Sequence, residues 1–438
     1  MRSVQNLGRE FYSYVRKNIL ASLGLSLYVI ADTIFISLAA GPLGLAALNI
    51  VLPIFNLFNS MGLLLGIGGA TIFSINNSLS QKTNTALYGQ LLTLGFFLGI
   101  FFASMANLLT EPLLTLLGAN QQTIGLASAY LRIVSLGAAF FILNYISVNF
   151  IRNDGNPRLT MLATLTETFF VLVIDYLFIF IFKWGMVGAA WATLFAPLAS
   201  LVVLTQHRHF TGRKLQLRLQ LPRFKNVLAV TRLGLPSFLT EMSTGVSIFV
   251  YNVVLLKSGG NLAIAAYGVV ANLALIVLAL FNGISFGMQP LLAREYGKNN
   301  WKNVRYILKL GLCTSLLIAF LSFGILLLFK YPIIGIFSRG TQTLMVHYAA
   351  VGIPLYFLSI FFSGININIM MFLISINQPR FSFFMSLMRG YVILLPSIVI
   401  LGHFWQMEGI WLSVTVTEFI ITIFGLFFTR NIFRQSFT

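Results

Sequence analysis

Five carboxylates lie inside long apolar segments of this chain, where an ionised side chain is costly. They are Asp32, Glu167, Asp175, Glu241 and Glu418. On insertion scales an aspartate at the centre of a membrane-spanning helix costs about 2.5–3.5 kcal/mol. Each acid is therefore a candidate for carrying or binding a cation, and the alternative is that it forms a private hydrogen bond within a helix bundle.

Two of these acids fall at a common depth with a hydroxyl group. With a rise of about 1.5 Å per residue, Asp32 lies about 24 Å from the inner end of its segment and Asp175 about 26 Å along another outward-running segment. Thr193 lies about 10 Å from the outer end of the next segment. Tyr28 precedes Asp32 by one helical turn and could orient it. Two carboxylates and a hydroxyl at one level suit a proton or Na⁺, a hard cation that takes oxygen ligands.

The other three acids lie near the middle of their segments. The depths are about 14 Å for Glu167, 16 Å for Glu241 and 15 Å for Glu418. Asn252 follows Glu241 by three turns on the same helical face. Carboxylates that face a cleft would attract cationic, partly apolar substrates. We therefore predict that Glu241, Glu167, Asn252 and Glu418 bind substrate; pairing with neighbouring Ser and Thr side chains is the alternative.

The composition shows which elements must position these residues. Of the 438 residues, 58% are hydrophobic and only 9% are charged, against about 25% charged in a soluble domain. The net charge of +18 would suit nucleic acid, but no soluble stretch is long enough to fold into a basic binding domain. The chain is predicted to be a polytopic helical membrane protein with no nucleic-acid partner.

Apolar stretches of spanning length occur twelve times, near residues 16–39, 44–70, 85–109, 124–150, 158–182, 187–206, 230–256, 262–290, 303–329, 343–371, 380–401 and 408–430. With the N-terminus inside, twenty-two of the 28 basic residues fall on the inner side. The positive-inside rule then predicts that both termini are cytoplasmic. A polar connection, 207–226, separates two six-span halves.

The two halves resemble each other. Residues 47–68 match 266–287 at an offset of 219, and KWGMVG matches FWQMEG at an offset of 221. Six spans return the chain to the same side, so the halves are parallel repeats. The expected fold is all-α, with twelve transmembrane helices in two six-helix lobes related by a pseudo-two-fold axis along the membrane normal. The expected domains are an N-terminal lobe (1–206), a cytoplasmic linker (207–226) and a C-terminal lobe (227–438).

No Walker pattern, dinucleotide-binding fingerprint or HExxH motif is present, and the one cysteine excludes a disulfide framework. We therefore expect a transporter rather than an enzyme. It should need no cofactor beyond a coupling ion, H⁺ or Na⁺.

Several stretches resemble one family: YVIADTIFI, GPLGLAALNIVLPIFNLFNSMGLLLGIGGA, RNDGNPRLTM, IDYLFIFIFKWGMVGAAWAT and GLPSFLTE. Together they are similar to the multidrug and toxic compound extrusion (MATE) family, and closest to the bacterial branch that contains the staphylococcal multidrug exporter. The resemblance covers nearly the whole chain. It implies two six-helix lobes around a V-shaped cleft, and export of organic cations against inward H⁺ or Na⁺.

The resemblance also places the family's cation site residue by residue. Its span-one Asp falls on Asp32, its span-five Asn-x-x-x-Asp on Val171 and Asp175, and its span-six Thr on Thr193. The Val in place of Asn removes an oxygen ligand, which weakens a Na⁺ site more than a proton site. The family's span-ten Asp has no counterpart in 343–371.

The resemblance therefore implies a monomeric antiporter in the lipid of the bacterial cytoplasmic (inner) membrane, with both termini cytoplasmic. It would export amphipathic organic cations, such as drugs and dyes, and so confer drug resistance. Two alternatives remain open. A lipid-linked-precursor flippase of the same superfamily would place several basic residues in its cavity, and here only Arg132 and Arg389 lie within spans. A major-facilitator transporter would carry a basic loop between spans two and three, where only Lys82 occurs.

Overall fold

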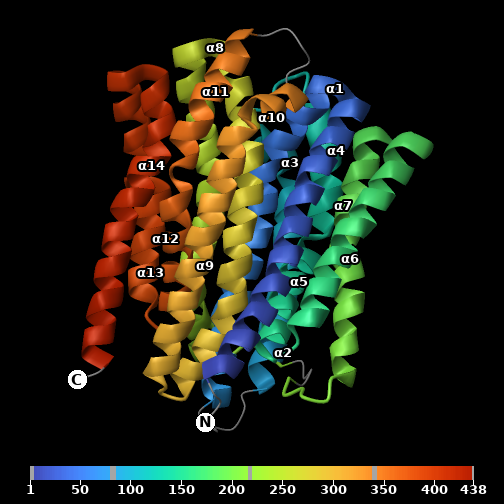
Figure 1. Ribbon diagram of the computed structural model, residues 1–438. Coiled ribbons are helices and arrows are strands. Elements are labelled where there is room, and N and C mark those ends of the chain that lie inside the picture. Colours follow the sequence, from blue (N-terminus) through green and yellow to red (C-terminus); the bar gives the residue numbers. More distant parts are fainter. Residues whose placement is uncertain (1–3, 79–84, 216–219, 338–342, 437–438) are drawn as a thin grey trace. The chain divides into compact units, whose positions relative to one another are not determined.

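Every regular element that the computed structural model describes is a helix, within residues 4–78, 85–215, 220–337 and 343–436 (Figure 1). The elements of the first half are α1 (Val4–Ser78), α2 (Thr85–Leu108), α3 (Thr110–Leu116), α4 (Ile124–Leu136), α5 (Ala138–Asn153), α6 (Pro157–Asp175), the π-helix η1 (Tyr176–Ile181), α7 (Gly185–Leu204) and the 3₁₀-helix η2 (Thr205–His209). The elements of the second half are α8 (Phe224–Gly297), α9 (Trp301–Leu328), α10 (Lys330–Phe337), α11 (Thr343–Phe357), α12 (Ile360–Ser375), α13 (Pro379–Leu387), the π-helix η3 (Met388–Val392) and α14 (Leu394–Ser436).

The apolar helices account for twelve membrane crossings. Nine helices in the described ranges are long and apolar enough to cross, or eleven if each of two bent pairs, α4–α5 and α11–α12, counts as one crossing. The stretch Pro379–Gln435 has 57 residues and, as one straight helix, would be about 85 Å long, far more than a bilayer core of about 30 Å. Its backbone leaves the helical conformation at Trp405 and Gln406, so it supplies two crossings. The predicted all-α, twelve-span fold is confirmed.

The backbone breaks at equivalent points in the two halves. α1 breaks at Gly41 (φ 62°, ψ −160°) and α8 at Gly260 (φ 65°, ψ −158°). This conformation is essentially restricted to glycine. Gly185 (φ 55°) and Gln406 (φ 48°) also share a positive φ. The two pairs have the offsets of 219 and 221 that relate the sequence motifs of the halves, so the repeat extends to backbone geometry.

The chain packs as two compact units, residues 20–242 and residues 1–19 with 243–438. In the first unit, glycines allow close backbone contact between 224–242 and the α1 segment 64–68: Gly234 packs on Leu64, and Gly68 on Val230. In the second unit, Gly287 packs on Val15, where an added Cβ would lie 2.8 Å from Val15 Cα.

The units therefore divide the chain at different points from the expected boundaries of 1–206, 207–226 and 227–438. The first part of α1 packs with the second half of the sequence, and the first part of α8 packs with the first half. The expected lobe boundaries describe the sequence repeat and remain a prediction. The contacts between residues divide the chain elsewhere, after Ile19 and after Met242.

Candidate functional site

Three of the predicted residues come together within the unit 20–242. Asp32 lies on α1, Asp175 is the last residue of α6, and Thr193 lies on α7. α6 and α7 run side by side (Figure 1). The start of α6 is fixed by Pro157 at its first position and by the Asn156 side chain, which accepts a hydrogen bond from the Leu159 N–H. After Asp175 the helix widens into η1, and such π-helical turns are frequent at functional sites.

Asp32 and Asp175 are buried and interact directly through their carboxyl groups. Asp32 Oδ1 and both carboxyl oxygens of Asp175 have no hydrogen bond of good geometry among the described residues. Tyr130, on α4, is within electrostatic range of both acids, and its Oη lies 3.4 Å from Thr193 Oγ1. Two buried carboxylates thus face one another, with oxygens able to accept a proton, beside a hydroxyl pair.

The surroundings of this acid pair are apolar. Four residues away from Asp32, Asp175, Tyr130 and Thr193, respectively, lie the buried side chains Ile36, Ile179, Val134 and Ala189, which all belong to one apolar cluster. Val171, one turn before Asp175, is also fully buried and adds no oxygen. Two negative charges in so dry a place would repel strongly and lack solvation. The pair is therefore suited to hold a proton or another small cation.

Tyr28, predicted to orient Asp32, belongs to α1, but its side chain lies outside the described residues. Its role stays a prediction.

Glu167 and Glu241 occupy a second region of the same unit. Asn144 Nδ2 donates a 2.9 Å hydrogen bond to Glu167 Oε2, and Ser200 Oγ donates a 2.8 Å hydrogen bond to Asn144 Oδ1. Tyr145 is within electrostatic range of both Glu167 and Glu241. Both acids are half-buried, and no described residue forms an ion pair with either. This region can offer negative charge beside an aromatic ring.

Glu418, also predicted to bind substrate, is held differently. In the other unit, Arg389 donates to Glu418 Oε1 from Nη2 at 2.6 Å and from Nε at 2.7 Å. Asn366 Nδ2 donates to Glu418 Oε2 at 2.7 Å. Both carboxyl oxygens are occupied and the charge is neutralised, which argues for a structural role. Asn252 is half-buried in this unit.

Sequence reasoning missed Tyr130, Asn144 and Arg389 as partners of these acids. Arg389 carried a usable signal, because a basic residue within a span needs an acidic partner and Glu418 is the in-span acid near it in sequence. Tyr130 carried none, since tyrosines are common at membrane interfaces and their direction is set by helix rotation.

The MatE family model matches residues 18–177 and 236–400. Multidrug export protein MepA of Staphylococcus saprophyticus is 28% identical over 91% of this chain and 88% of its own length. MepA of a Staphylococcus aureus strain is 25% identical over 90% of this chain and 86% of its own length.

Solved structures share the fold. A multidrug resistance MATE family transporter of the MOP superfamily, in an outward-facing conformation, superimposes with a TM-score of 0.92 at 20% identity, covering 100% of this chain and 99% of the other. A variant of the Vibrio cholerae MATE transporter VcmN gives 0.90 at 20% identity, with 100% of both chains covered. The family-model match covers well over half of the sequence, so this chain belongs to the MatE family of multidrug and toxic compound extrusion (MATE) transporters.

Proposed function

We propose that this transporter exports amphipathic organic cations in exchange for H⁺ across the bacterial cytoplasmic membrane. The observation that carries the proposal is the Asp32–Asp175 pair, buried with three oxygens that have no hydrogen bond of good geometry among the described residues. Buried polar groups are normally paired, and acids inside a membrane normally mark an ion path. A proton bound between the two carboxyl groups would give these oxygens a hydrogen-bond partner in one step of the transport cycle. Its departure in another step would restore the negative charge.

The small number of available oxygen ligands favours H⁺ over Na⁺ as the coupling ion. Thr193 Oγ1 already faces Tyr130 Oη, and Val171 offers no oxygen at the turn before Asp175. A Na⁺ ion at Asp32, Asp175 and Thr193 would need several further oxygen ligands, whereas a proton needs only one carboxylate and an acceptor oxygen. Na⁺ coupling is the outcome that would correct this choice.

Glu167 and Glu241 are the proposed contacts of the cationic substrate. Both lack an ion-pair partner among the described residues, and Tyr145, which is within electrostatic range of both, can contribute a cation–π contact. This arrangement suits a positively charged, partly aromatic compound better than a phosphate-bearing lipid precursor, which acids would repel. The relatives named as multidrug exporters agree with such a substrate class.

In the proposed cycle, loading the acid pair with a proton removes the repulsion between Asp32 and Asp175 and lets α1 and α6 pack closer. The break in α1 at Gly41 and the wide turn η1 after Asp175 are the places where the helices can adjust. Release of substrate on the outside would follow protonation. Both termini would lie in the cytoplasm, as the distribution of basic residues predicts. The protein would act as a monomer.

Transport in proteoliposomes, with pH and Na⁺ gradients imposed separately, tests this function. We expect ethidium movement to follow the pH gradient in the wild type and to be lost in D32N and D175N. E408Q is the matched control, since Glu408 is an exposed acid outside the site. If D32N moves ethidium as well as the wild type, the coupling role is wrong; if only a Na⁺ gradient drives transport, the proton assignment is wrong.

A further inference from the structure

A cavity of about 980 Å³ lies in the unit 20–242, and none of the in-span acids described above lines it. Its walls come from α2, α5, the end of α7, η2 and the following connection. Neither Asp32 nor Glu167 lines it, so the proposed transport cycle does not use it. It is large enough for a drug-sized or lipid-sized ligand.

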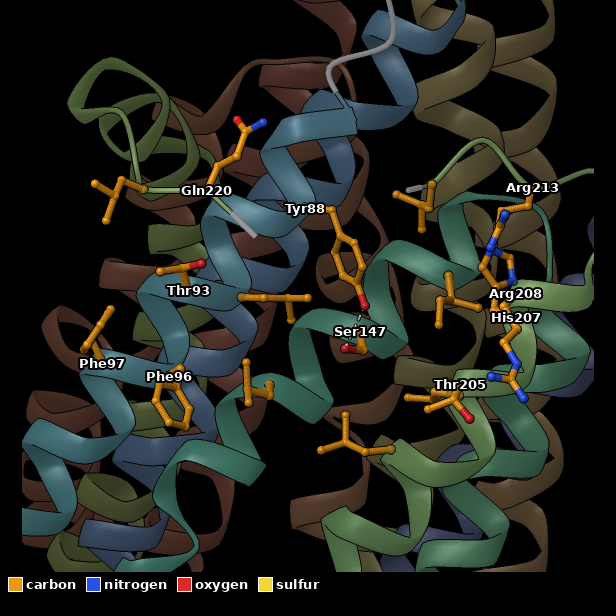
Figure 2. A pocket seen from close by; sticks show the side chains of 17 residues that line it. Tyr88, Thr93, Phe96, Phe97, Ser147, Thr205, His207, Arg208, Arg213 and Gln220 are labelled. Carbon is orange, nitrogen blue, oxygen red and sulfur yellow. Dashed lines mark hydrogen bonds between the residues drawn. The ribbon is translucent and has the colours of Figure 1, made fainter. Parts of the chain in front are cut away.

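The two sides of this cavity differ in chemistry (Figure 2). Arg208 and Arg213 stand together on one side, and Phe96 and Phe97 stand on the other. Tyr88 and Ser147 lie between them, where Tyr88 Oη donates a 3.1 Å hydrogen bond to Ser147 Oγ. The cavity therefore presents positive charge, then a hydroxyl pair, then an apolar wall.

Both arginines can bind an anion. Among the described residues neither forms an ion pair, and both are exposed. The carboxylate of Asp154 is engaged by other groups. Its Oδ2 lies 2.8 Å from His207 Nε2, and it accepts hydrogen bonds from the backbone N–H groups of Lys214 and Leu215. Asp154 thus anchors the chain just before Arg208 and just after Arg213.

The apolar wall lies deeper along the helices than the charged side. α2 begins at Thr85, so Phe96 lies about 16 Å into it. The arginines follow the end of α7 at Leu204. Phe96 and Phe97 are 44% and 59% exposed, which for a membrane helix means contact with acyl chains. The cavity is consequently open toward lipid where it is apolar.

We propose that this cavity binds one anionic phospholipid of the surrounding bilayer. Its phosphate lies at Arg208 and Arg213, its glycerol esters lie near Tyr88 and Ser147, and one acyl chain follows the wall at Phe96. Basic pockets between transmembrane helices bind anionic lipid head groups in this manner. A cationic drug does not fit, because the arginines would repel it.

The test uses the full-length protein in detergent, with dioleoyl-phosphatidylglycerol, dioleoyl-phosphatidylcholine and inorganic phosphate as separate probes. Native mass spectrometry counts the lipids that stay bound. We expect one phosphatidylglycerol per chain in preference to phosphatidylcholine. In R208Q/R213Q its apparent Kd should rise about tenfold or more. T93W, which fills the apolar side without changing charge, should also weaken binding; if it does not fold, Thr93→Leu serves the same purpose.

R223Q/K225Q is the matched control, because both residues are exposed basic groups outside the cavity and the loss of charge is the same. It should leave lipid binding unchanged. If R223Q/K225Q weakens lipid binding as much as R208Q/R213Q does, the attraction is a diffuse effect of surface charge. If phosphatidylglycerol and phosphatidylcholine are retained equally, the cavity does not recognise a head group. If inorganic phosphate displaces the bound phosphatidylglycerol as effectively as added lipid does, the cavity is a site for small anions and not for a phospholipid. Each of these results would overturn the proposal.

Discussion

The two halves of the chain repeat one polar framework and attach different charges to it. Asn144 and Ser200 of the first half correspond to Asn366 and Thr422 of the second, at a common offset of 222. Ser200 Oγ donates to Asn144 Oδ1 at 2.8 Å, and Thr422 Oγ1 donates to Asn366 Oδ1 at 3.0 Å. In both halves the asparagine Nδ2 then donates to a glutamate Oε2.

The glutamates come from different helices, and this changes the net charge of the framework. In the first half the acceptor is Glu167 on α6, which forms no ion pair with a described residue. In the second half the residue equivalent to Glu167 is Arg389, and it pairs with Glu418 on α14. One framework keeps an acid that can gain or lose charge, whereas the other is a closed ion pair.

A second equivalent position shows the same contrast. Asp32 corresponds to Tyr251, at the offset that also relates the breaks in α1 and α8. Tyr251 Oη and Ser413 Oγ share a hydrogen bond at 2.5 Å, and its ring stacks on Tyr267 at 4.7 Å. Tyr251 thus carries no charge where the first half has an acid, and its hydroxyl group has a hydrogen-bond partner. At these two equivalent positions, therefore, the first half has the acids Asp32 and Glu167, whereas the second half has Tyr251 and Arg389, each of which has a side-chain partner.

The largest effect should come from the acid pair. D32N or D175N removes the charge that a proton would neutralise, so drug transport driven by a pH gradient should fall to background in proteoliposomes. Y251F, at the position equivalent to Asp32, should retain transport because no charge changes there. Loss of transport in Y251F equal to that in D32N would erase the contrast between the halves.

The next largest effect should be on stability in the second half. R389Q leaves Glu418 buried without its cation, and breaking a buried ion pair by removing one partner costs about 3–5 kcal/mol. R389Q/E418Q removes both charges and should recover most of that loss. Denaturant unfolding of the purified protein measures both. A double variant as unstable as R389Q would show that the site needs the ion pair for more than charge balance.

E167Q should behave in the opposite way. Gln keeps an oxygen that can accept from Asn144 and breaks no ion pair, so stability should change by less than about 1 kcal/mol. Affinity for a cationic dye should fall, because the carboxylate that attracts it is gone. Dye binding followed by fluorescence anisotropy tests this, with E111Q, an exposed acid, as the control. Unchanged dye affinity in E167Q would remove Glu167 from the substrate site.

The sequence predicts the spans, the repeat and the five in-span acids because these depend on local features. Hydropathy places helices, and depth along a helix follows from its rise, so the residue numbers alone put Asp32, Asp175 and Thr193 at one level. Partner choice depends instead on how each helix is rotated about its axis. That is why the sequence offers nearby threonines as partners of Glu418, while its partners are Arg389, 29 residues away, and Asn366.

The smallest effect tests whether the two frameworks are built alike. S200A and T422V each remove one buried donor to an asparagine Oδ1, and each should cost about 1 kcal/mol of unfolding free energy. Only S200A should also weaken dye transport, because Asn144 then loses the contact that aims it at Glu167. S258A removes an exposed hydroxyl bond and should change neither. If T422V alters transport as much as S200A, the second framework takes part in the cycle and the halves are less specialised than their charges suggest.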